Sequence, residues 1–296
     1  MNLIQRLSSI QELPTLPEVA LRIRALVISE EGDASMLSRI IEQDPSLSSK
    51  ILKVANSSFY CSAGRRINSI KNAITRIGFN QIGNISMAVC LIRQFSRKSN
   101  ILNYKQFWKH SLSAAFLTSL VHDTSSETSL NNEKQSIFLS GLLHDIGILI
   151  YDQFFHEEFE KIIDYAMQKE ISYHEAELEL FPNETHAAIG SALLEMWKLD
   201  SSVISSIRYH HSPEKAPENF RPYVFVTYLT EYILCNSSLG TFEGMVVPGN
   251  KQVLNALSLT PDMIESFLKL AQYEVERSDL IMALESDNST LQLRTV

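Results

Sequence analysis

A histidine and an aspartate stand side by side at positions 144 and 145, within the apolar stretch IFLSGLLHDIGILIY at 137–151. The apolar residues of this stretch would surround a helix on every face, so the pattern predicts one buried core helix over 137–151. An ionised carboxylate buried there without a partner would cost several kcal/mol or more. His144 and Asp145 therefore require a compensating charge or a bound metal ion elsewhere in the fold.

Five more side chains of the same chemical kinds lie in other apolar helical segments: His110, His186, His210, His211 and Glu231. Each alone is weak evidence, because a buried histidine can be satisfied by a backbone carbonyl. Together with the 144–145 pair they favour one shared site over seven separate burials. His210 and His211 would project about 100° apart on a helix, which suits two ions, or one ligand and one hydrogen-bonding neighbour. The alternative is a metal-free helical protein whose histidines are satisfied internally.

Other residues of these types are predicted to take no part in chemistry. His122 and Asp123 form a second adjacent pair, but the loop-like composition of TSSETSLNNEKQS follows at once, which predicts a solvated, inert pair. Solvated helix faces are also predicted for two histidines and the acidic residues around them: His156, His174, Glu157, Glu158, Glu175 and Glu177.

The composition bounds the class of protein. With 296 residues, 45% of them hydrophobic and 20% charged, the chain has the make-up of a soluble globular protein. The amino terminus lacks the apolar stretch of a signal peptide, and no window of about 18 uncharged apolar residues predicts a membrane span. We therefore expect a cytoplasmic protein without membrane contact. Cys61, Cys90 and Cys235 are odd in number and widely spaced, which argues against disulfides or a thiolate zinc site.

Charge is unevenly distributed along the chain. The net charge is −8, yet residues 1–100 hold 13 Lys+Arg against 7 Asp+Glu, and no acidic residue occurs between Asp44 and Asp123. The basic amino-terminal half is a candidate surface for a nucleotide or another anion. The alternative is that these bases pair with the acidic half or are solvated. Helices around Gly78 resemble a helix-turn-helix, but none is dense in Arg, Asn and Gln, so DNA is not expected as a partner.

Helix signals are frequent and strand signals are scarce, which predicts an all-α protein. Asp33 and the Asp44-Pro45 pair mark the starts of two helices, and two more flank Gly78. Longer helical segments follow from about residue 104, and two polar amphipathic helices are expected over 251–284.

Three regions are predicted along the chain. Residues 1–100 form a smaller amino-terminal helical lobe, residues 101–240 form the helical core that carries the site, and residues 241–296 form a helical extension. No stretch resembles a linker that would separate independent domains.

The order of the candidate site residues resembles a known family. The metal-ligand order of the HD superfamily of metal-dependent phosphohydrolases is matched by His110, His144-Asp145, His186, His210-His211 and Glu231. Three amino-terminal segments resemble its HDOD branch, the HD-related output domain of bacterial signalling: LPTLPEVALRI, IIEQDPSLSSKILKVANSSFY and INSIKNAITRIGFNQI. The resemblance runs from about Leu13 to Leu234.

The resemblance implies an HD-domain-like helical core with one or two divalent metal ions, iron or manganese being expected, including a di-iron centre. A first ion would be surrounded by His110, His144, Asp145 and Glu231. A second would be surrounded by His186 and His210, with Asp145 bridging and His211 nearby. In an active enzyme the ions would activate a water molecule, and turnover would depend on Asp145.

The departures from the related cyclic-di-GMP phosphodiesterases bear on catalysis. Ile148 stands where their HDxGK motif has a phosphate-holding lysine, and SPEKAPENF replaces their Gly-Tyr-Pro segment. Glu231 stands where the superfamily has aspartate, and Gln106 stands where related enzymes can carry a glutamate ligand. Metal binding tolerates such changes better than catalysis does.

The sequence therefore predicts a stand-alone regulatory module of signal transduction that acts in trans on a signalling or regulatory protein. It would retain a His/Asp metal site with little or no hydrolase activity. The alternative is a metal-dependent phosphohydrolase acting on a nucleotide or a cyclic dinucleotide, so the question of enzymatic activity stays open.

Overall fold

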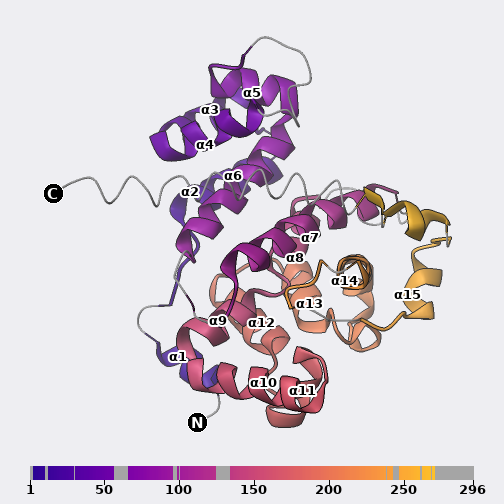
Figure 1. The fold of residues 1–296 in the computed structure, drawn as a ribbon. Helices are drawn as coiled ribbons and strands as arrows, with labels where there is room; N and C mark the ends of the chain where they lie inside the picture. Colours follow the sequence, from indigo (N-terminus) through magenta and orange to yellow (C-terminus); the bar gives the residue numbers. More distant parts are fainter. Residues whose placement is uncertain are drawn as a thin grey trace. The chain divides into compact units, whose positions relative to one another are not determined.

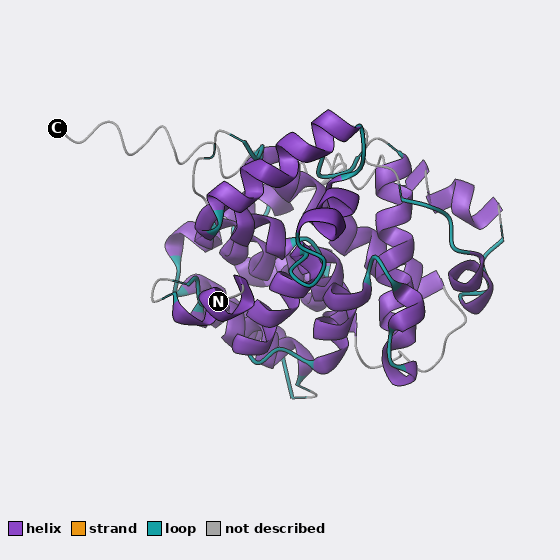
Figure 2. Ribbon diagram, turned by 90° about the horizontal axis from the view of Figure 1, so that it is seen from below, coloured by secondary structure: helices purple, strands orange, loops and turns teal. Residues whose placement is uncertain are grey.

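The computed structural model describes residues 3–10, 13–29, 31–56, 66–95, 99, 101–124, 134–237, 239–242, 247–260, 262–267 and 269–270. These residues form helices, turns and loops and contain no strand (Figure 2). The predicted all-α fold is confirmed for this part of the chain. It divides into a larger unit, within Met1–Leu13 and Lys98–Val275, and a smaller unit, within Pro14–Arg97.

The smaller unit consists of five labelled helices: α2 (Glu18–Ile28), α3 (Ala34–Glu42), α4 (Pro45–Ala55), α5 (Ile70–Ile77) and α6 (Phe79–Gln94). The predicted helix starts are confirmed. The Asp33 carboxylate accepts hydrogen bonds from two backbone N–H groups in the first turn of α3, and the Asp44 carboxylate accepts one from Leu47 N at 3.0 Å in α4. Gly78 has φ of 103°, a conformation that favours glycine, at the turn between α5 and α6.

The larger unit carries the remaining α-helices that Figure 1 labels: α1 (Leu3–Ser9), α7 (Tyr104–Thr124), α8 (Lys134–Leu143), α9 (Ile146–Phe154), α10 (His156–Lys169), α11 (Tyr173–Leu180), α12 (His186–Met196), α13 (Ser201–Tyr209), α14 (Arg221–Asn236) and α15 (Lys251–Ala256). Two short 3-10 helices, η2 (Pro213–Lys215) and η3 (Glu218–Phe220), lie between α13 and α14. Helix α1, which lies within the range predicted for the amino-terminal lobe, packs against α12 of this unit. The second helix expected within 251–284 is described over 262–267 and 269–270, and residues 261, 268 and 271–284 lie outside the described residues.

The prediction of one continuous helix over 137–151 is wrong. The chain forms α8 and α9, which are bent by 41° at a break that holds His144 and Asp145. The Gly141 carbonyl, which a continuous helix would pair with the N–H of residue 145, accepts a hydrogen bond at 2.8 Å from the His144 ring. The break directs two adjacent side chains into the interior of the unit, where both are buried.

Two glycines allow the helices on either side of the break to approach their neighbours closely. A Cβ atom at Gly141 would collide with Thr118 and the backbone of α7, and one at Gly147 would collide with the His186 carbonyl oxygen at the start of α12. The absence of a side chain at these positions therefore brings α7 and α12 close to the His144-Asp145 turn.

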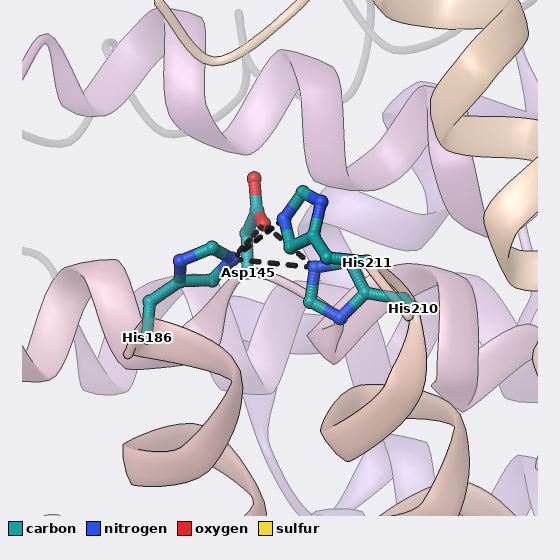
Figure 3. Close-up of side chains that lie close together, drawn as sticks. All are labelled: Asp145, His186, His210 and His211. Atoms are coloured by element: carbon teal, nitrogen blue, oxygen red, sulfur yellow. Dashed lines mark hydrogen bonds and ion pairs between the residues drawn. The ribbon is translucent and has the colours of Figure 1, made fainter. Parts of the chain in front are cut away.

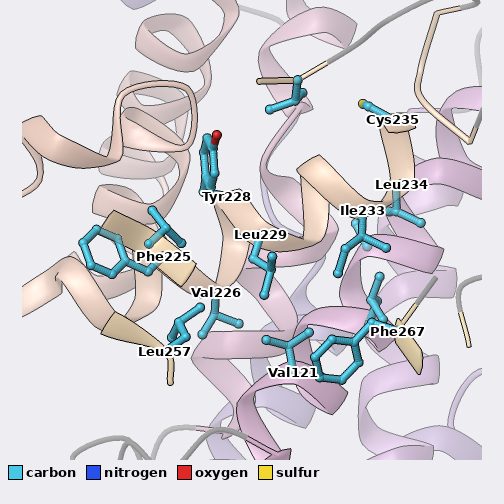
Figure 4. Close-up of a cluster of buried hydrophobic side chains, with 14 residues drawn as sticks. Val121, Phe225, Val226, Tyr228, Leu229, Ile233, Leu234, Cys235, Leu257 and Phe267 are labelled. Carbon is cyan, nitrogen blue, oxygen red and sulfur yellow. The ribbon is translucent and has the colours of Figure 1, made fainter. Parts of the chain in front are cut away.

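Apolar packing holds α14 in place beside the site. Buried side chains of α7 and α14, together with Val247, Val253, Leu257 and Phe267, form one cluster (Figure 4). Each fully buried aliphatic or aromatic side chain contributes roughly 1.5–3 kcal/mol relative to an exposed one. The face of α14 that carries Glu231 is thus fixed against α7 by its neighbours.

Among the described residues, no single helix has both the length and the apolar character needed to cross a membrane, although the bent pair α8 and α9 reaches that threshold as a pair.

Candidate metal centre

The structure brings all seven predicted site residues together in two groups that share Asp145. We call His110, His144, Asp145 and Glu231 the first subsite, and Asp145, His186, His210 and His211 the second subsite. In each group the candidate ligand atoms lie within 4.8 Å of one another. The residues come from α7, the α8–α9 break, α12, the end of α13 and α14.

The first subsite is built around the Glu231 carboxylate. Its Oε2 atom lies 3.1 Å from His110 Nε2 and 3.2 Å from His144 Nε2, and these two nitrogens are 3.0 Å apart. Asp145 Oδ2 completes the group at 3.7 Å from His110 Nε2 and 3.4 Å from His144 Nε2.

The second subsite is built around the other oxygen of Asp145 (Figure 3). Asp145 Oδ1 lies 3.4 Å from His186 Nε2 and 3.7 Å from His210 Nε2. The Nε2 atoms of His210 and His211 lie 3.2 Å and 3.1 Å from His186 Nε2. One carboxylate therefore presents a different oxygen to each group, as expected of a bridging ligand.

Hydrogen bonds on the far side of the rings determine which nitrogen of each histidine carries the proton. A carbonyl oxygen can only accept, so Nδ1 donates to Leu239 O in His110 at 2.8 Å and to Ile207 O in His210 at 2.6 Å. His144 makes the corresponding bond to Gly141. In the neutral form of these rings the Nε2 lone pairs face one another across the site.

Two buried carboxylate oxygens of the site are unsatisfied. Asp145 Oδ1 and Glu231 Oε2 have no hydrogen-bond partner among the described residues. Converging lone pairs and anionic oxygens in a buried site are satisfied by a cation. Imidazole nitrogen and carboxylate oxygen form a donor set that suits iron, manganese and similar ions, so the residues present fit a metal centre.

The site also shifts the pKa values of its own groups. Burial alone would raise the pKa of Asp145, but the neighbouring histidines His144, His210 and His186 lower it well below its ordinary value. Burial would lower the pKa of His144, yet Asp145 and Glu231 raise it well above the usual range. At His210, burial outweighs the effect of Asp145 and lowers the pKa to about 4, which keeps the ring in the neutral form that binds metals.

Glu177 belongs to the site, so the prediction that it is solvated is wrong. It is fully buried and accepts hydrogen bonds at 2.6 Å from both the backbone N and the Nδ1 of His186. This contact directs His186 Nε2 at the second subsite. Tyr173, Ala176 and Glu177 share the buried face of α11. Helical spacing from Tyr173 and Ala176 therefore indicated that Glu177 is buried, but its charge led to the prediction that it is solvated.

His174 was also predicted to be solvated, and this too is wrong. Its side chain is 20% exposed, its ring stacks on His211 at 4.0 Å between centroids, and its Nδ1 lies 3.4 Å from Glu177 Oε2. His156, by contrast, keeps 53% of its side chain exposed, as predicted.

The prediction that the second His-Asp pair is solvated is wrong for His122 and correct for Asp123. His122 is buried near the end of α7, whereas 51% of the Asp123 side chain is exposed. Helix α7 continues to Thr124, so the loop composition after residue 123 does not reach the histidine. Neither residue joins a candidate metal group among the described residues.

Residues 239–242, which we call the strap, cover the first subsite. Leu239 O accepts from His110, and Thr241 Oγ1 donates to Asp145 Oδ2 at 2.8 Å. Gln106 holds the strap by donating from Nε2 to Gly240 O at 3.2 Å. Behind the subsite, the Cys235 thiol donates to Glu231 Oε1 at 2.9 Å. None of these contacts was predicted: the strap lies in a loop without a periodic pattern, and the i,i+4 pair of Cys235 and Glu231 on α14 was overlooked.

The basic residues of the smaller unit do not share one environment. Lys50 is buried, and Arg93 pairs with Asp44 at 2.8 Å. Lys53 and Arg66 line a hollow of about 670 Å³. An anion site in this part of the chain stays a prediction.

Comparison with known proteins places the chain in a family. The model of the HDOD domain family matches residues 13–213. An uncharacterized protein of Treponema pallidum (strain Nichols) is 25% identical over 215 residues, which make up 73% of this chain. The chain spans only 40% of the length of that relative.

Two solved structures share the fold. An HDOD domain protein of unknown function from Geobacter sulfurreducens has a TM-score of 0.73 at 25% identity, with 98% of this chain and 94% of that chain covered. A candidate signal transduction protein from Marinobacter aquaeolei VT8 has a TM-score of 0.74 at 25% identity, with 96% of this chain and 60% of that chain covered. Since the family model spans well over half of its length, this chain belongs to the HDOD domain family.

Proposed function

We propose that this chain is a regulatory HDOD module of signal transduction that acts through a protein partner, retains a metal centre and has little or no hydrolase activity. The enclosure of the first subsite carries the proposal. Its four ligands are at most 1% exposed, and the strap bonds directly to His110 and Asp145. A phosphodiester substrate would have to displace the strap before it met an ion there.

The third residue beyond Asp145 supports the same conclusion. Ile148, at the position of the phosphate-holding lysine in related phosphodiesterases, is fully buried in α9. Neither its chemistry nor its position allows it to neutralise a phosphate. The similarity to a candidate signal transduction protein is consistent with a regulatory role.

The proposed metal is iron or manganese, with one ion in each subsite. When bound, such ions supply positive charge and, in an active enzyme, an acidified water. The chain's own residues hold the imidazole rings in the ligating tautomer and keep Asp145 and Glu231 ionised.

The first test combines metal content with hydrolysis. Elemental mass spectrometry of tag-free protein should find about one to two equivalents of iron or manganese, given the two donor groups. The same preparation should not hydrolyse bis(p-nitrophenyl) phosphate or cyclic dinucleotides above background. Metal-dependent turnover that disappears in Asp145→Ala would overturn the regulatory assignment.

The partner is tested separately. Affinity capture from the source cell should recover one specific signalling or regulatory protein, which should then bind the purified chain in calorimetry. Repeated capture without such a protein would count against action through a partner.

The second candidate function is a metal-dependent phosphohydrolase that acts on a nucleotide or a cyclic dinucleotide. One observation favours it, because His211 of the second subsite lines a cavity of about 520 Å³ that a substrate could enter. Turnover in the hydrolysis test would select this function.

A further inference from the structure

We propose that a hollow in the smaller unit binds the phosphate group of a small molecule. The hollow has a volume of about 670 Å³, which falls within the range of pockets that bind small molecules. Its lining comes from one face of α4 and from residues 66–68, which precede α5. The two subsites lie in the larger unit, so this inference does not depend on the metal centre.

One wall of the hollow is an outward face of α4. The opposite face of this helix, which carries Ile51, is buried in the core of the unit. The outward face is roughly 10 Å long, at 1.5 Å per residue, so it offers room for a molecule larger than a bare phosphate ion. Its residues follow the i, i+3, i+4, i+7 spacing of a single helical face: Ser49, Leu52, Lys53 and Asn56.

The other wall is held against α4 by the Asn56 side chain. Its Nδ2 atom donates to Leu52 O at 2.8 Å and to Ile67 O at 2.7 Å, and its Oδ1 atom accepts from Ile67 N at 2.7 Å. The buried side chain of Ile67 anchors the same segment in the core. Arg66 and Asn68, which flank Ile67, therefore line the hollow from a backbone that is already fixed before a ligand binds.

The charges around the hollow favour an anion. Lys53 and Arg66 contribute two positive charges to the lining, and none of the described lining residues is acidic. No acidic residue occurs between Asp44 and Asp123, so α5 and α6 also carry none. The Asp44 carboxylate is already engaged, because it accepts from a backbone N–H of α4 and pairs with Arg93 at 2.8 Å. The lining therefore has a positive potential of its own, without a bound metal ion.

The helix ends beside the hollow do not reverse this sign. The carboxyl end of α4 carries about half a negative charge, and the amino end of α5, two residues after Asn68, carries about half a positive one. Lys53 lies in the last turn of α4 and also offsets the negative end of that helix. Arg66 is exposed and has no ion pair among the described residues, so it is the main contact for an anion.

The donors of the lining match phosphate better than carboxylate. A phosphate group presents three strong acceptor oxygens, and a guanidinium can donate to two of them at once. The Lys53 ammonium, the Ser49 hydroxyl and the Asn68 amide supply further donors. Leu52 is half-buried and offers an apolar contact for an organic part of the ligand. Two basic residues are few for a nucleic acid, whose binding depends on many phosphate contacts, so a small molecule is the better fit.

The experiment measures binding to the full chain by calorimetry, with AMP, adenosine, inorganic phosphate and acetate as probes. AMP should bind and adenosine should not, because the phosphate group makes the main contact. Inorganic phosphate should bind more tightly than acetate, and both AMP and phosphate should bind more weakly as the salt concentration rises. The affinities should be the same for Mn²⁺-loaded and EDTA-treated protein. Tighter binding of AMP than of phosphate would identify an organic phosphate as the ligand, and equal binding would identify inorganic phosphate itself.

Variants locate the binding. Arg66→Gln should lower the affinity for AMP roughly 10- to 100-fold, as expected for loss of charge-assisted hydrogen bonds. Lys53→Gln should lower it about three- to tenfold, because this charge is shared with the end of α4. Arg39→Gln is the matched control, since Arg39 is an exposed arginine of α3 in the same unit, bonds to Ser35 O at 3.3 Å and does not line the hollow. This variant should bind AMP like the wild type, and all three should keep the wild-type Tm.

Four results would overturn the inference. The first is failure of AMP and phosphate to bind, and the second is binding of adenosine as tight as that of AMP. The third is binding that requires Mn²⁺ or survives Arg66→Gln, because the ligand would then lie elsewhere, as at the metal centre. The fourth is tighter binding of a short DNA duplex than of AMP, which would assign the surface to nucleic acid. None of these results bears on metal content, so the proposed function stands or falls separately.

Discussion

The two subsites use the same kinds of ligand and share Asp145, yet their surroundings differ. The strap and the Cys235 thiol enclose the first subsite, whereas Glu177 lies behind the second and a cavity lies in front of it. A closed donor set serves mainly to hold an ion, and an open one can also accept a further ligand. Ligand identity alone therefore does not fix the role of a site.

Removal of the Asp145 carboxylate should remove the difference between the two subsites, because both contain it and both should lose their ion. Asp145→Ala should lose both ions, which corresponds to a fall in affinity of at least about a thousandfold. Elemental mass spectrometry of the purified variant measures this loss. Asp123→Ala, at the other His-Asp pair, is the control and should retain wild-type metal content. A variant at position 145 that kept both ions would show that Asp145 does not bridge.

Chelation should separate the subsites by access. At neutral pH, EDTA should remove one equivalent of metal quickly and the second slowly, because only the second subsite opens to a cavity. Stopped-flow absorbance of a metallochromic dye follows the two phases. Single-phase release of both ions would contradict the difference in enclosure.

Glu177 should matter to the second subsite only. Glu177→Gln keeps the shape but removes the charge behind His186, and loss of such a partner costs about 10- to 100-fold in metal affinity. Calorimetric titration with Mn²⁺ should show one weakened and one unchanged site. Glu179→Gln on the same helix is the control, since Glu179 accepts from Tyr165 at an exposed position.

Cys235 should have a smaller effect, on the first subsite only. Its thiol occupies Glu231 Oε1 and leaves Oε2 to face His110 and His144. Cys235→Ala should weaken that ion about two- to tenfold, because S–H is a weak donor, and Cys235→Ser should restore the affinity. Cys90→Ser, at a buried cysteine of the smaller unit, should leave metal binding unchanged.

The smallest expected effect is on the pH dependence of stability. The pKa of His144 is raised above its ordinary value of 6.5 in the metal-free protein, so its protonated form stabilises the fold at low pH. This contribution is lost as the pH rises through the folded-state pKa, and a metal ion then replaces the proton. The increase in Tm on adding Mn²⁺ should therefore be larger at about pH 8 than at about pH 6, by roughly a few degrees. An equal increase at both values would contradict this linkage.

Helical periodicity predicted most of the helices and singled out the buried candidate residues, and the resemblance to the HD superfamily predicted how they group. Histidines on apolar helix faces stand out because burial demands a partner, and the structure places all seven predicted residues in the two subsites. Asp33 and Asp44 likewise revealed helix starts through local chemistry.

What escaped prediction depends on contacts between distant segments. The apolar pattern of 137–151 continues on both sides of His144 and Asp145, so it gave no sign that the helix breaks there and that His144 bonds to Gly141 O. Glu177 appeared solvated by composition, although its place on α11 turns it inward. The strap residues Leu239 and Thr241 reach the site through tertiary folding and have no local signature.

The close approach at Gly147 has a consequence for mutational tolerance. Helices α9 and α12 carry Asp145 and His186 at their starts and pack where a Cβ atom on residue 147 would meet the His186 carbonyl. In a saturation scan, every substitution with a side chain would push these two starts apart. Substitutions at position 147 would therefore impair the metal centre as much as substitutions of a ligand do, although residue 147 contributes no atom to the centre.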